Sequence, residues 1–123
     1  MLAEARRLLG RVNPQRAKQI RDMGGLLVDI RPAAQRARYG EVPGSLVIER
    51  NVLEWRLDPH GADSLPEARD KNRPVVIMCQ EGYASSLAAA SLLHLGRWGV
   101  TDLEGGFVAW KDAGLPVTPP TDG

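Results

Sequence analysis

Short apolar runs that do not alternate with polar residues constrain the fold of this chain more than any other feature. The two clearest runs are residues 26–30 and residues 75–79. Continuous apolar residues are typical of strands that are buried on both faces. Segments with helical signals separate the runs, and strands separated by helices form parallel sheets through right-handed crossovers. The pattern therefore predicts an α/β fold in which a mostly parallel central sheet carries helices on both faces.

Turn and capping residues place the other elements along the chain. Asn13 followed by Pro14 is typical of the start of a helix, and the Gly-Gly pair ten residues later is typical of its end. We expect helices at residues 3–9, 14–23, 33–38, 52–56, 66–71, 85–95 and 107–112. We expect strands at residues 26–30, 46–48, 75–78 and 100–103.

The chain is expected to form a single domain, because its 123 residues match the usual size of one. The core would span about 14–117, with an N-terminal helical extension at 1–13 and a tail at 118–123. The net charge is +1, from 16 basic and 15 acidic side chains, so no overall field favours nucleic acid or a membrane surface. No run approaches the roughly 18 apolar residues of a membrane span, and the first residues lack a secretory signal. We expect a cytoplasmic protein with no nucleic-acid or membrane partner.

The single cysteine limits the chemistry that the chain can perform. It excludes an internal disulfide and a zinc site built from several cysteines. His60 and His94 are not spaced like metal ligands relative to each other or to another ligand. We therefore expect no metal and no cofactor.

The first 22 residues carry a local excess of positive charge, with six basic and two acidic groups. The simplest interpretation is a solvated helix face. A docking surface is the alternative, although the rest of the chain does not reinforce it.

Cys79 lies where a buried strand is expected to end, and a short loop leads from it to a helix. Such a loop turns several backbone N–H groups toward one point, and the first helical turn adds unpaired donors. Gly82 permits the positive φ that a tight curl needs. An anion is stabilised there, so a thiolate would be a nucleophile near neutral pH. An inert buried cysteine is the alternative.

Asp29 and Arg31 follow another expected strand. Open α/β sheets bind ligands beyond the carboxyl ends of their strands, which places these residues near Cys79. We expect Asp29 to accept amide hydrogens from the neighbouring loop and Arg31 to pair with a carboxylate, in a role that supports the site.

Four motifs, in this order, resemble the rhodanese family of single-domain sulfurtransferases. The resemblance extends over about residues 14–117 and implies the rhodanese-like three-layer fold. The motifs are Leu26-Leu27-Val28-Asp29-Ile30-Arg31, Gly40-Glu41-Val42-Pro43-Gly44-Ser45, the Cys79, Gly82 and Ser85 of a C-x-x-G-x-x-S loop, and Gly105-Gly106-Phe107-Val108-Ala109-Trp110 with Gly114-Leu115-Pro116-Val117.

The resemblance implies that Cys79 is the catalytic nucleophile. In this family a cysteine thiolate takes the outer sulfur of a small donor such as thiosulfate, and the persulfide passes it to a thiol, protein or cyanide acceptor. The loop after Cys79 would bind the substrate, with Tyr83 at its rim and the two serines capping the helix or touching substrate. The loop residues are Gln80, Glu81, Gly82, Tyr83, Ala84, Ser85 and Ser86. Sulfur on Cys79 must leave to another molecule, because the chain has no second cysteine.

Two loop residues depart from the family's pattern. Ala84 stands where many active members carry arginine or lysine, and Glu81 is the only charged side chain of the loop. A carboxylate at the site would repel an anionic donor. A non-catalytic rhodanese-like module that binds or senses sulfur is therefore the alternative. Phosphatase or arsenate reductase chemistry is disfavoured, because those enzymes have arginine where this chain has Ser85.

Overall fold

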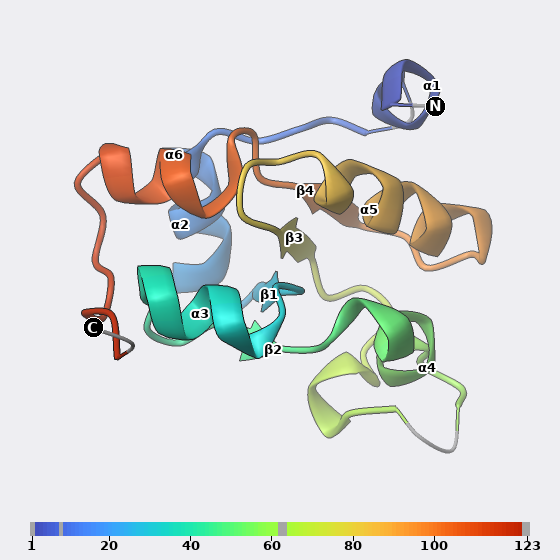
Figure 1. Ribbon diagram of the computed structural model, residues 1–123. Coiled ribbons are helices and arrows are strands. Elements are labelled where there is room, and N and C mark those ends of the chain that lie inside the picture. The colour runs from blue at the N-terminus through green and yellow to red at the C-terminus, as the bar shows by residue number, and fades with distance from the viewer. Residues whose placement is uncertain (1, 8, 62–63, 122–123) are drawn as a thin grey trace.

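A parallel sheet forms the centre of the computed structural model, which describes residues 2–7, 9–61 and 64–121 (Figure 1). Within these residues the sheet has four strands in the order β2-β1-β3-β4, and every pairing is parallel. The strands are β1 (Leu26–Asp29), β2 (Leu46–Val47), β3 (Val75–Met78) and β4 (Val100–Asp102). The α/β fold and the parallel sheet expected from the apolar runs are confirmed.

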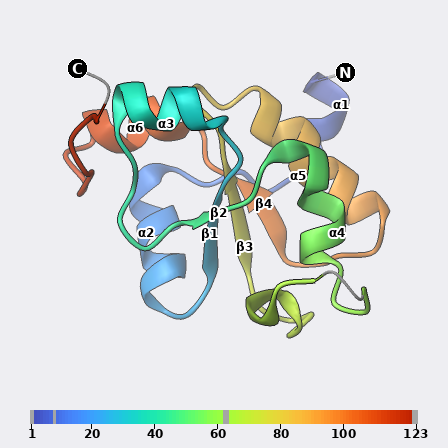
Figure 2. The same cartoon turned by 60° about the horizontal axis from the view of Figure 1, so that its bottom comes forward.

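Helices cover both faces of this sheet. They are α1 (Leu2–Arg7), α2 (Pro14–Asp22), α3 (Ala33–Tyr39), α4 (Leu53–Leu57), α5 (Ala84–His94) and α6 (Gly106–Asp112), with 3-10 turns η1 (Arg50–Val52) and η2 (Pro66–Ala68). Figure 2 shows the sheet between α2 on one side and α4 and α5 on the other. The helix start predicted at Asn13 is confirmed, because its side chain accepts a hydrogen bond of 2.8 Å from the Arg16 N–H. Leu8, in the first expected helix, lies outside the described residues.

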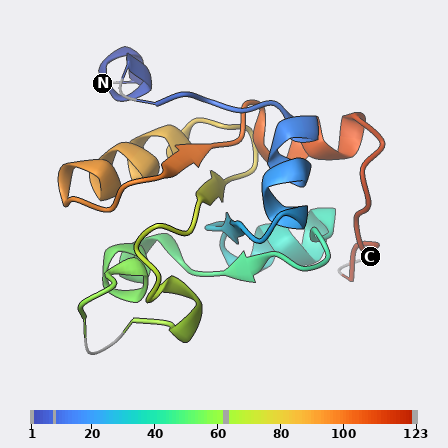
Figure 3. The same ribbon diagram turned by 180° about the vertical axis from the view of Figure 1, so that it is seen from behind.

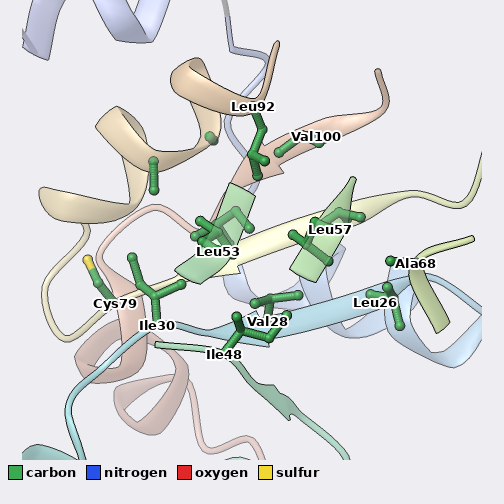
Figure 4. Packing of buried hydrophobic residues seen from close by; sticks show 14 of the residues in the cluster. Leu26, Val28, Ile30, Ile48, Leu53, Leu57, Ala68, Cys79, Leu92 and Val100 are labelled. Carbon is green, nitrogen blue, oxygen red and sulfur yellow. The ribbon is translucent and has the colours of Figure 1, made fainter. Parts of the chain in front are cut away.

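Two apolar clusters, one on each face, hold the helices against the sheet. Successive strand residues point to opposite faces, so Val28 and Ile77 belong to one cluster while Leu27 and Val76 belong to the other. The first cluster contains Leu53 and Leu57 of α4 and Ala88, Ala89 and Leu92 of α5 (Figure 4). The second contains Ala17 of α2 and Phe107 and Trp110 of α6. The alternation places Cys79 on the face covered by α4 and α5.

The segment between α1 and α2 runs along the end of β4. The Val12 N–H donates to the Asp102 carbonyl at 3.1 Å, and the Glu104 N–H donates to the Val12 carbonyl at 2.8 Å. These bonds form a parallel bridge between Val12 and Leu103. Beyond this segment α1 packs against α5, as Figure 3 shows from behind. The N-terminal residues are thereby brought to the end of the sheet where Cys79 lies. Among the described helices, none has the length and apolar character needed to cross a membrane.

Candidate active site

Cys79 sits in a cradle of backbone N–H groups directly after β3. Its sulfur accepts hydrogen bonds from the Gly82 N–H at 3.1 Å and from the Ser85 N–H at 3.3 Å. The residue is only 7% exposed, and Figure 4 shows its sulfur at the edge of the apolar cluster, beside Ile30. Gly82 has φ +91°, the positive value that the short loop requires. Two donors aimed at one sulfur stabilise a thiolate there.

The first turn of α6 holds the cysteine loop by hydrogen bonds to two of its carbonyl groups. The Phe107 N–H donates to the Cys79 carbonyl at 2.8 Å, and the Val108 N–H donates to the Gln80 carbonyl at 3.1 Å. Gly106 makes this approach possible, because a Cβ there would overlap the Cys79 carbonyl oxygen and lie 2.8 Å from the Gln80 carbonyl carbon. The motif Gly105-Gly106-Phe107 therefore lets the start of α6 pack directly against the backbone of the cysteine loop, and we call this packing surface the α6 floor of the site.

A buried carboxylate ties α5 to β4 behind the loop. Asp102 is fully buried and accepts hydrogen bonds of 2.8 Å from the hydroxyls of both Ser85 and Ser86. Neither serine caps the helix, because α5 begins one residue earlier and its cap, Tyr83, makes no side-chain cap bond. Asp102 was not among the site residues predicted from the sequence. Its position at the end of a strand next to the cysteine strand was the one signal that could have indicated it.

Two arginines, one in α1 and one in the segment between α1 and α2, donate hydrogen bonds to the loop. Arg11 pairs with Asp102 at 3.0 and 3.2 Å and donates to the Gly82 carbonyl at 3.1 Å. Arg6 donates to the same carbonyl at 3.0 Å and to the Ser86 hydroxyl at 3.1 Å. The basic N-terminal residues were expected to form a solvated helix face. This holds for Arg7, whose side chain is 74% exposed, but not for Arg6 and Arg11, which bind the loop.

The Asp29–Arg31 pair lies on the opposite side of the loop and is completely buried. Arg31 donates from Nη2 to Asp29 at 2.9 Å, and the Arg31 N–H donates to the same carboxylate at 3.0 Å. The Arg31 guanidinium also reaches the Gln80 side chain at 3.0 Å and lies 4.1 Å from the centre of the Phe107 ring. The expected pairing of Arg31 with a carboxylate is present, and through Gln80 it touches the loop.

The remaining loop side chains face solvent. Glu81, Tyr83 and Ala84 are all exposed, and Tyr83 is 60% exposed. Water screens the Glu81 carboxylate, which weakens its repulsion of an anionic ligand. No cluster of three or more potential metal ligands occurs among the residues that the structure describes.

Comparison with known proteins identifies the family. The family model described as Rhodanese-like domain matches residues 13–113. The chain belongs to the rhodanese-like family. A thiosulfate sulfurtransferase GlpE from Pseudomonas savastanoi is 32% identical over 101 residues, which cover 82% of this chain and 86% of that protein. A sulfurtransferase from Allochromatium vinosum is 37% identical over 95 residues, 77% of this chain and 79% of the relative.

Solved structures agree with the rhodanese-like fold. A Rhodopseudomonas palustris protein, RPA3614, described as of unknown function and a possible tyrosine phosphatase, has a TM-score of 0.86 and 32% identity, covering 95% of this chain and 90% of its own. A polysulfide-sulfur transferase from Wolinella succinogenes has a TM-score of 0.71 over 95% of this chain and 83% of that chain. At 20% identity the second match shows the fold alone.

Proposed function

We propose that this protein is a sulfurtransferase that carries a sulfane sulfur as a persulfide on Cys79. The observation that carries the proposal is the Cys79 sulfur, which accepts two backbone hydrogen bonds at the mouth of a parallel sheet. The similarity to enzymes named as sulfurtransferases supports the same activity.

The proposed reaction has two displacement steps at sulfur. The Cys79 thiolate attacks the outer sulfur of thiosulfate, the S–S bond of the donor breaks, and sulfite leaves with the electron pair. An acceptor thiolate or cyanide then attacks the outer sulfur of the Cys79 persulfide. The Cys79–sulfur bond breaks, the thiolate is restored, and the acceptor leaves as a persulfide or as thiocyanate. Neither step has a net change in protons.

Unused N–H groups of the loop suit the outer sulfur of the persulfide. Among the described residues, the backbone N–H groups of Glu81, Tyr83 and Ala84 have no hydrogen-bond partner. They belong to the same loop as the two donors that already reach the sulfur of Cys79. In the persulfide, the anionic outer sulfur lies one bond beyond the Cys79 sulfur, and such preorganised donors would stabilise it. Three other loop side chains fix the shape of the loop. Gln80 accepts a hydrogen bond from Arg31, and the hydroxyls of Ser85 and Ser86 donate to Asp102.

The acceptor in this proposal comes from outside the chain. Because Cys79 is the one cysteine of the sequence, no second thiol of the chain can take the sulfur from the persulfide. A small thiol or a thiol of another protein suits this requirement.

The likeness to a possible tyrosine phosphatase makes phosphate chemistry a second candidate, and the site argues against it. A phosphoryl dianion needs a guanidinium that can bind two of its oxygens. The sixth residue after Cys79 is Ser85, whose hydroxyl is engaged by Asp102. Arg6 and Arg11 are already bound to a backbone carbonyl. Sulfur transfer therefore suits the site better.

Intact-mass measurement tests the proposal directly. The protein is incubated separately with thiosulfate, with mercaptopyruvate and with an organic persulfide, and we expect a gain of ~32 Da, one sulfur atom, on the wild type. The Cys79→Ser variant should gain nothing. Subsequent addition of cyanide or a thiol should remove the added mass. A wild type that gains no sulfur from any donor, under conditions that load a known sulfurtransferase, would favour the non-catalytic module.

A further inference from the structure

We propose that Arg6 and Arg11 form a cationic clamp on the Gly82 carbonyl and act as positioning residues for the anionic sulfur in the Cys79 loop. The nature of that sulfur rests on the function proposed above. Both arginines precede the segment that the family model matches. The loop from Gln80 to Ser86 contains no basic side chain, so the clamp supplies from the N-terminus a positive charge that the loop lacks.

Each guanidinium is held from two sides. Nη2 of Arg6 lies 3.0 Å from the Gly82 carbonyl oxygen and Nη2 of Arg11 lies 3.1 Å from it. Arg11 is fixed by its ion pair with buried Asp102, and Arg6 by its bond to Ser86. The Arg11 side chain is 16% exposed, so water screens its charge only in part. The two positive charges therefore have a defined place beside the loop.

The clamp determines where the next N–H group points. The described residues contain no cis peptide bond, and in a trans peptide the C=O and the following N–H point in opposite directions. The Gly82 carbonyl points to the guanidiniums, so the Tyr83 N–H points away from them and, with no partner among the described residues, is available to a ligand of the loop. Bonding a carbonyl to two cations also polarises its peptide group and strengthens that N–H as a donor.

The consequence is a preference for an anion over a neutral ligand next to the Cys79 sulfur. The positive charge and the oriented Tyr83 N–H both stabilise an anionic outer sulfur, or the sulfonate end of a donor, more than an uncharged group. A residue that merely held the loop together would affect charged and neutral reagents alike.

Alkylation of Cys79 by two reagents measures this preference without any sulfur transfer. Iodoacetate is anionic and iodoacetamide is neutral, and both react with the same thiolate. We expect Arg6→Gln to lower the ratio of their rate constants about fivefold, which corresponds to ~1 kcal/mol. Arg6→Lys, which keeps the charge, should retain most of the ratio. Arg7→Gln is the matched control, because Arg7 lies in the same helix and, among the residues that the structure describes, pairs only with exposed Glu4.

An unchanged ratio in Arg6→Gln would overturn the clamp, whether both rate constants stay at the wild-type value or fall by the same factor. An equal fall in both would mean that Arg6 only stabilises the loop. The proposed sulfur transfer is judged separately by the gain of ~32 Da on the wild type. A wild type that never gains sulfur, with a ratio that still depends on Arg6, would refute the transfer function and support the clamp.

Discussion

Gly106 offers the sharpest test of how the floor of the site holds the cysteine loop. In Gly106→Ala the new Cβ would overlap the Cys79 carbonyl oxygen and lie 2.8 Å from both the carbonyl carbon and the carbonyl oxygen of Gln80. These are backbone atoms, so the loop itself must move. The residue also has φ +61°, a conformation that alanine adopts at a cost of about 1–2 kcal/mol.

The expected loss of stability follows from the contacts at this position. Moving the loop weakens the hydrogen bonds that Phe107 and Val108 donate to the carbonyls of Cys79 and Gln80, and each contributes about 1 kcal/mol. Together with the backbone strain, Gly106→Ala should lower the free energy of unfolding by about 3–4 kcal/mol. Its loop should also hold the sulfur less well, so Cys79 alkylation at neutral pH should slow several-fold.

Gly114 provides a matched control for the strain alone. It has φ +78°, and a Cβ there would meet nothing within 4 Å. Gly114→Ala should therefore lose only about 1–2 kcal/mol and keep the wild-type alkylation rate. In urea, the free energy of unfolding should fall by about 1.5–2 kcal/mol per molar denaturant, so the denaturation midpoints of Gly106→Ala and Gly114→Ala should differ by roughly 1 M. Equal midpoints and equal alkylation rates for the two variants would refute the role assigned to the α6 floor.

Three further variants test the rest of the structure. Asp102→Asn should lower the free energy of unfolding, measured in urea, by about 3 kcal/mol, because it removes the buried partner of an ion pair. Asp112→Asn, at an exposed site, is its control. A loss below about 0.5 kcal/mol in Asp102→Asn would contradict the role of the carboxylate. Trp110→Ala empties a fully buried site and should lose about 3–5 kcal/mol by the same assay, so a near-native midpoint would argue against a core role. Burial alone would raise the pKa of Glu54, but the hydrogen bond from Ser91 and the charge of Arg50 lower it overall. Because the pKa is lower in the folded protein, the ionised carboxylate stabilises it at neutral pH, and this stabilisation is lost as the pH falls through the lowered pKa. The free energy of unfolding of Glu54→Gln should therefore be about 0.5 kcal/mol below that of the wild type at pH 7 and equal to it in acid. A difference that persists in acid would contradict this.

The fold was predictable because its causes are local or periodic. The uninterrupted apolar runs correspond to β1 and β3, and the cap at Asn13 starts α2 where the motif predicted it. The boundaries differ by a residue or two, as at α5, which begins at Ala84 rather than Ser85. The stretch expected as a helix at 66–71 contains only the 3-10 turn η2, which is one turn long.

The surroundings of Cys79 were predictable only in part. The cysteine and Gly82 lie in a continuous stretch of chain, so their relation to the coming helix could be derived from spacing. The roles of Ser85 and Ser86 could not, because they depend on Asp102, which lies 17 and 16 residues further along the chain. The orientation of Glu81 likewise depended on what packs around the loop.

Local chemistry established the strand, the glycine curl and the position of one thiol at the end of a parallel sheet. The charges around that thiol come from long-range contacts. Arg6 and Gly82 are 76 residues apart, and Arg11 and Asp102 are 91 residues apart. Propensity, capping and periodicity act over a few residues and are readable from sequence, whereas a distant guanidinium reaches the loop only because strand pairing carries the N-terminal segment along β4. The candidate nucleophile could thus be predicted from its own segment, while its electrostatic setting required the folded chain.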